Sequence, residues 1–138
     1  MLKKSILVGS LSVASALQAT DSPFLITSES LPHVTKLIQQ HWDTQDLALS
    51  NEQKNKLLPI RIHTIEAVKE LKAKIYTLEE EVIEGLVDEA SLESLEPKID
   101  EIAKLKASNT KIQLQCLKKT LSVLNDKQIK FLLPFWGM

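Results

Sequence analysis

Three histidines, His33, His41 and His63, are the side chains of this sequence best suited to hold a transition metal. Neutral imidazole is a common ligand of Zn, Ni and Cu. His33 and His41 are eight residues apart, which separates them by about 80° around a helix, so only folding can bring the three rings together. The histidines define a metal-site hypothesis, with Cys116 or Met138 as a further ligand, beside the expectation that no cofactor is bound.

Cys116 is the only cysteine, so the chain cannot form an internal disulfide. Its place on the apolar stripe of its segment favours a small buried side chain. The functional alternatives are an intermolecular disulfide and a reactive thiol. A catalytic cysteine needs a base, and no histidine lies on the same segment. Because no set of base, nucleophile and oxyanion donors can be assembled, we expect a protein that is not an enzyme.

Residues 1–19 have the pattern of a signal peptide. Lys3 and Lys4 precede a short run of apolar and small residues, and cleavage is expected between residues 16 and 20. The run is too short and too rich in serine for a spanning helix, which needs about 20 mainly apolar residues. We therefore expect export to the periplasm and no membrane span after signal removal.

Charge limits the partners of the mature chain. Without Lys3 and Lys4, 15 basic side chains stand against 18 acidic ones, whereas nucleic-acid-binding proteins normally have a basic excess. Residues 66–101 hold twelve acidic and four basic side chains, and residues 102–130 hold seven lysines and one acid. Solvated faces and docking surfaces for charged partners both explain this asymmetry. No binding of nucleic acid is expected.

Apolar residues at spacings of three and four predict an all-helical domain over residues 31–133, between an irregular lead (20–30) and an apolar tail (134–138). The expected fold class is all-α, a long antiparallel helical hairpin with short flanking helices. Two long helices bury little surface when they pack alone, so we expect a homodimer or closure by the short helices. The expected helices run from 31 to about 47, from 50 to a turn within 85–97, from that turn to about 123, and from 125 to 134.

The hairpin is expected to bury a near-heptad stripe that includes Leu58, Ile62 and Ile65 in its first long helix. Two serines can cap the second long helix. Ser94 is favoured over Ser91, because Pro97 would then lie in the first helical turn, where no amide donor is needed.

Two similar motifs begin the first long helix and the last short one, at 49–53 and 124–128. In each, Ser50 or Asn125 can accept a hydrogen bond from the first helical turn, and the glutamine three residues later can reach back. Paired motifs of this kind, on either side of a helical hairpin and behind a signal peptide, resemble the LTxxQ proteins of the bacterial periplasm, which include the Spy and CpxP type stress chaperones. The matching positions are Leu49, Ser50, Gln53, Leu124, Asn125 and Gln128.

This resemblance covers about residues 31–133 and implies a cradle-shaped dimer of interlocked hairpins. It also implies a stress-response function, either holding unfolded clients without ATP or modulating a periplasmic sensor domain. The family includes zinc- or nickel-responsive proteins, so a metal-responsive sensor is the alternative. A structural subunit of an envelope assembly is the third hypothesis.

The C-terminal stretch is the most apolar and aromatic part of the mature chain, and it includes Phe131, Phe135 and Trp136. We expect it to pack over the open end of the hairpin or across a dimer. Contact with a client or partner is the alternative, because exposed apolar area often marks an interaction site.

Overall fold

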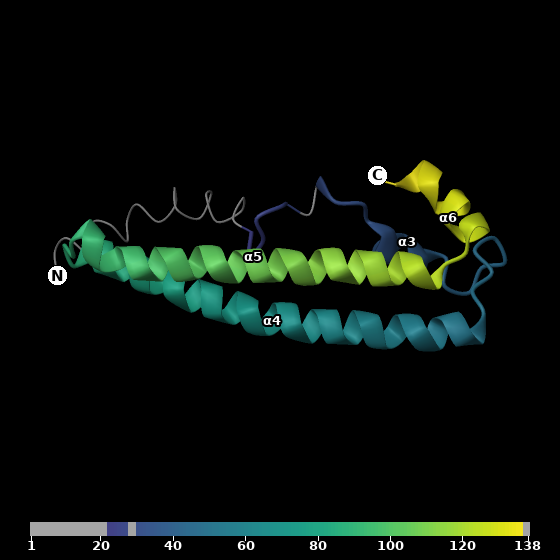
Figure 1. The fold of residues 1–138 in the computed structure, drawn as a ribbon, viewed down its shortest axis with the longest axis horizontal. Helices are drawn as coiled ribbons and strands as arrows, with labels where there is room; N and C mark the ends of the chain where they lie inside the picture. Colours follow the sequence, from purple (N-terminus) through teal and green to yellow (C-terminus); the bar gives the residue numbers. More distant parts are fainter. Residues whose placement is uncertain (1–21, 28–29, 137–138) are drawn as a thin grey trace. The chain divides into compact units, whose positions relative to one another are not determined.

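The computed structural model describes residues 22–27 and 30–136, so the expected signal peptide lies outside the described residues. The described part is helical and contains no strand. Its elements are α3 (Val34–Gln40), α4 (Asn51–Val87), α5 (Leu92–Val123), α6 (Asp126–Leu132) and a 3-10 helix, η2 (Leu133–Phe135). The two long helices, α4 and α5, pack against each other (Figure 1). None of the described helices combines the length and the apolar character needed to cross a bilayer.

The chain divides into two compact units, and α4 and α5 each contribute to both. The described residues of the first unit are 22–25 and 70–109. Those of the second unit are 26–27, 30–69 and 110–136.

The second unit contains the larger hydrophobic core. One buried cluster includes Val34 of α3, Leu57 of α4, Leu132 of α6 and Leu124, which precedes α6. Burying a side chain of this size contributes about 1.5 to 3 kcal/mol. Within this unit the short helices α3 and α6 cover the ends of α4 and α5, which is one of the two expected ways to close a thin core.

In the first unit α4 and α5 meet closely. A Cβ atom added to Gly85 would lie 2.5 Å from Cδ2 of the buried Leu95. The absence of a side chain at this position therefore allows the close approach. Lys98 Nζ lies 3.1 Å from a carboxylate oxygen of Glu81, a second link between the two helices. Asn109 is fully buried, and its side-chain Nδ2 donates to the carbonyl of Pro23 at 3.2 Å.

The first short helix ends earlier than expected. α3 stops at Gln40, whereas the periodicity predicted an end near Leu47. The Thr44 hydroxyl donates to the His41 carbonyl at 3.1 Å and accepts from the Leu47 amide at 3.5 Å. Side-chain hydrogen bonds of this kind compete with the backbone hydrogen bonds of a helix, which explains why α3 ends early. Leu47 is nevertheless fully buried and belongs to the core cluster of the second unit.

The turn between the long helices is shorter than the expected 85–97 segment, because it occupies only residues 88–91. The prediction that Ser94 caps α5 was wrong. The Ser94 amide donates to the Ser91 hydroxyl at 3.2 Å, so Ser91 is the capping residue. The Ser94 hydroxyl instead donates to the Ser91 carbonyl at 2.7 Å. Pro97 lies inside α5.

Replacing Ser91 by alanine is expected to lower the free energy of unfolding by about 1 kcal/mol, because α5 loses its side-chain cap. Urea denaturation followed by circular dichroism measures this change. Ser94→Ala is the matched control and should change stability by less than about 0.5 kcal/mol. A larger loss in the Ser94 variant than in the Ser91 variant would show that the cap is assigned to the wrong serine.

Candidate functional site

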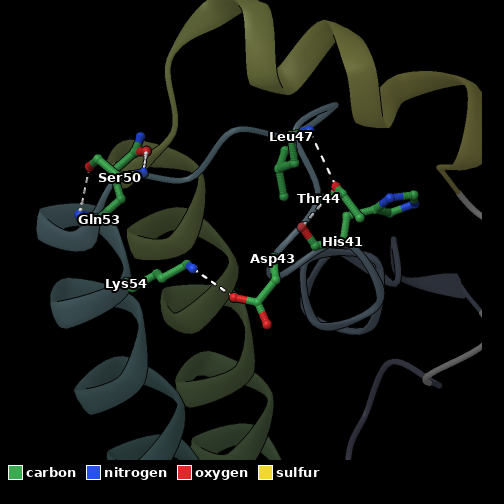
Figure 2. Close-up of polar contacts among 7 residues, drawn as sticks. All are labelled: His41, Asp43, Thr44, Leu47, Ser50, Gln53 and Lys54. Carbon is green, nitrogen blue, oxygen red and sulfur yellow. Dashed lines mark hydrogen bonds and ion pairs between the residues drawn. The ribbon is translucent and has the colours of Figure 1, made fainter.

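The motif at the start of α4 forms the predicted capping box. The Gln53 amide donates to the Ser50 hydroxyl at 3.0 Å, and the Ser50 amide donates to Gln53 Oε1 at 3.0 Å. Both bonds are drawn in Figure 2. Each bond satisfies an amide that the first helical turn leaves without a backbone partner. Leu49, which precedes the box, packs half-buried against the core of the second unit.

The second motif forms the same box at the start of α6. The Gln128 amide donates to Asn125 Oδ1 at 2.8 Å, and the Asn125 amide donates to Gln128 Oε1 at 2.9 Å. Leu124 is buried in the core cluster, in the position equivalent to Leu49. Both capping boxes are therefore confirmed as local structure.

The two motifs also bind each other through their glutamines, 75 residues apart. Gln53 Nε2 donates to Gln128 Oε1 at 2.8 Å, and Gln128 Nε2 donates to Gln53 Oε1 at 3.0 Å. The remaining amide hydrogens reach backbone carbonyls, that of Val123 from Gln53 and that of Leu47 from Gln128, both at 3.0 Å. All donors and acceptors of the two side-chain amides are thus used. This reciprocal pair fastens the beginning of α4 to the beginning of α6.

Two adjoining hollows, of about 430 and 420 Å³, lie beside α3 in the second unit. They share Thr35 and Gln39 of α3, Arg61 of α4 and Cys116 of α5. We call them together the α3 groove. The first hollow is also lined by Ile38, Trp42, Asp43, Leu57, Leu58 and Thr120, and the second by Leu31, Pro32, His33, Lys36, Thr64, Ile65, Gln113 and Leu117. The volume of each hollow falls in the range of ligand-binding clefts.

The α3 groove carries an excess of positive charge. Asp43 is its only acidic lining residue, and Lys54 Nζ lies 2.8 Å from its carboxylate (Figure 2). Arg61 and Lys36 line the groove as well, and within residues 22–27 and 30–136 neither forms an ion pair. The guanidinium of Arg61 can bind a carboxylate through two parallel hydrogen bonds.

A stripe of exposed apolar side chains runs along α4 at the edge of this groove. Leu58, Ile62 and Ile65 are 49%, 55% and 51% exposed and recur at helical spacing, so they share one face. We call these three residues the α4 stripe. Sequence periodicity assigned them to the buried stripe of the hairpin, and that assignment was wrong. Leu57, on a neighbouring face, is buried in the core in their place.

The three histidines lie on separate elements. His33 lines the α3 groove, His41 follows α3, and His63 is exposed on α4. The His41 ring contacts the rings of Phe131 and Phe135, with centroids 5.0 and 5.9 Å away. In the described part of the chain, no three His, Cys, Asp or Glu side chains are grouped closely enough to hold a metal ion. The metal-site hypothesis stays a prediction.

Cys116 is half-buried and lines both hollows of the α3 groove. In the C-terminal stretch, Phe131 and Trp136 pack against the core cluster of the second unit. Phe135 is exposed to 37%, and its ring tilts against Phe131 at 5.9 Å. The stretch therefore covers the core with part of its aromatic surface and leaves another part exposed.

Sequence reasoning missed Arg61 and Trp42 as lining residues. An arginine on a long amphipathic helix is usually solvated, and nothing local marks Arg61 as different. The available signal was the crowding of apolar residues between Leu57 and Ile65, where α4 carries more of them than one stripe needs.

Comparisons with protein-family models, with curated proteins and with solved structures found no match to this chain. The resemblance to the LTxxQ proteins therefore rests on the paired motifs and their arrangement in the chain.

Proposed function

We propose that the mature chain is a periplasmic stress-response protein of the Spy and CpxP type. It holds unfolded clients, or modulates a periplasmic stress sensor, without ATP and without catalysis. The observation that carries this proposal is the α4 stripe, a contiguous row of half-exposed Leu and Ile side chains on a long helix. Large contiguous patches of exposed apolar surface are uncommon on soluble monomers, and such patches often serve an interaction.

Membership of the LTxxQ family is part of this proposal. It is supported by the two capping boxes and by the reciprocal glutamine pair that joins them. A motif that served only to start a helix would not need its glutamine to bind a second copy of itself. Through this pair, both copies of the motif help to hold the starts of α4 and α6 together.

An antiparallel hairpin and a homodimer complete the proposal. The contacts of Gly85 with Leu95 and of Glu81 with Lys98 fit an antiparallel pairing of α4 and α5, because residue numbers rise on one helix as they fall on the other. The acidic segment 66–101 and the basic segment 102–130 are complementary in charge, which favours an antiparallel arrangement of two copies.

Aggregation of a denatured client tests the proposal. A client diluted from guanidinium chloride should scatter less light when the mature chain is present in equimolar amount, with no nucleotide added. Absence of any effect at a large molar excess would contradict holding activity.

The variant Leu58→Gln/Ile62→Gln/Ile65→Gln should need about ten times more protein for the same suppression, because client contact loses its apolar surface. Its free energy of unfolding should change little, since the three side chains are exposed. The matched control is Ile26→Gln/Leu114→Gln/Leu133→Gln, which removes exposed apolar side chains that do not form a stripe. Equal losses in both variants would show that the stripe has no special part in client binding.

A further inference from the structure

We infer that the α3 groove binds a short extended segment of an unfolded protein in which large apolar side chains flank a carboxylate. This inference rests on the proposed client binding and gives it a location and a sequence preference. It follows from the dimensions, the charge and an unused hydrogen-bond acceptor of the groove.

The groove has the size of a short peptide. Its wall on α4 runs from Leu57 to Ile65, which corresponds to about 12 Å of helix. An extended chain advances about 3.3 Å per residue, so the groove accommodates about four residues. Apolar side chains line it at both ends, Ile38 and Trp42 in one hollow and Leu31 and Ile65 in the other.

The positive charge of the α3 groove favours a bound segment that contains a carboxylate. Arg61 belongs to both hollows and therefore lies where they adjoin, and Lys36 adds a second positive charge. The acidic Asp43 is already paired with Lys54 at 2.8 Å, so it offsets little of this charge. A carboxylate in the middle of the bound segment can meet the Arg61 guanidinium while its apolar neighbours enter the two hollows.

One residue that lines the groove also has a hydrogen-bond acceptor without a partner in the described part of the chain. Gln113 Oε1 is buried and has no hydrogen-bond partner among the described residues. A buried acceptor without a partner costs free energy. Gln113 lines the second hollow, so a rotation of its side chain on binding would bring this acceptor to a backbone N–H of the bound segment.

Peptide binding to the full mature chain tests the inference. The probes are a dye-labelled peptide of sequence Ser-Leu-Phe-Asp-Phe-Leu-Ser and its Asn-containing counterpart, followed by fluorescence anisotropy. The Asp peptide should bind about three times more tightly than the Asn peptide, as expected for a partly exposed ion pair. In Arg61→Gln this preference should disappear, whereas Lys56→Gln, an exposed control on the same helix, should keep it.

Cys116 reports where the peptide binds, because it is the only cysteine and lines both hollows. Bound Asp peptide should slow its reaction with a thiol reagent in a saturable way. Thr35→Phe, which fills the groove from α3, should weaken peptide binding while circular dichroism shows unchanged helix content. This variant keeps the inference testable if Arg61→Gln fails to fold.

Three results would overturn the inference. They are unchanged Cys116 reactivity at saturating peptide, an Asp preference that survives in Arg61→Gln, and Cys116 protection that rises with protein concentration in the absence of peptide. The last result would assign the groove to a second copy of the chain. If the wild-type chain still suppresses aggregation in these cases, the proposed holding function survives; if it suppresses none, that function fails whatever the peptides do.

Discussion

Gln128→Ala is expected to lower the free energy of unfolding by about 3 kcal/mol. The Gln128 side chain is 5% exposed and bonds Gln53, the Leu47 carbonyl and the Asn125 amide. Its removal leaves these buried or half-buried groups without partners, and each such group costs about 1 to 3 kcal/mol. Urea denaturation of the mature chain followed by circular dichroism measures the loss.

Gln115→Ala is the matched control, because this glutamine is exposed on α5. It should change stability by less than about 0.5 kcal/mol. A second variant, Gln128→Glu, keeps the shape and the acceptors but loses the donors to Gln53 and Leu47, so it should also be clearly destabilised. A loss below about 1 kcal/mol in Gln128→Ala would mean that the glutamine pair contributes little to the second unit.

Leu132→Ala is expected to cost about 3 kcal/mol for a different reason. Leu132 has no exposed area and lies in the core cluster together with Val34, Leu57 and Leu124. Truncation removes buried methyl groups and leaves a cavity, for which Leu-to-Ala changes cost about 2 to 5 kcal/mol. Because α6 has only seven residues, it depends on this contact to stay packed.

The adjacent residue provides the control. Leu133 is 52% exposed, and Leu133→Ala should change the free energy of unfolding by less than about 1 kcal/mol. Both changes are measured by urea denaturation. Similar effects of the two substitutions would contradict the placement of Leu132 in the core and of Leu133 at the surface.

Local rules predicted much of this fold from the sequence. Two helix starts were predictable because a capping box involves residues only three positions apart. The two boxes are formed by Ser50 with Gln53 and by Asn125 with Gln128. The bond between Gln53 and Gln128 was not predictable in the same way. It joins residues 75 positions apart, so it depends on how the helices pack, which no local pattern encodes.

The misplaced α4 stripe has a similar cause. Apolar periodicity identifies a helix, but Leu57 and Leu58 begin two apolar faces that lie side by side on it. Which face is buried depends on where α3 and α6 lie, and these short helices cover Leu57 and leave Leu58 half-exposed. The α3 groove escaped prediction for the same reason, because its walls come from three separate helices.

Site-specific photocrosslinking is the most direct test of client binding by the α4 stripe. A photoreactive amino acid at Ile62 should crosslink to a denatured client and not to the same client in its folded form. The same label at Lys56, which is exposed on another face of α4, should give little crosslinking to either form. Crosslinks that are equally strong from both positions, or absent from Ile62, would contradict the proposal that this stripe holds unfolded proteins.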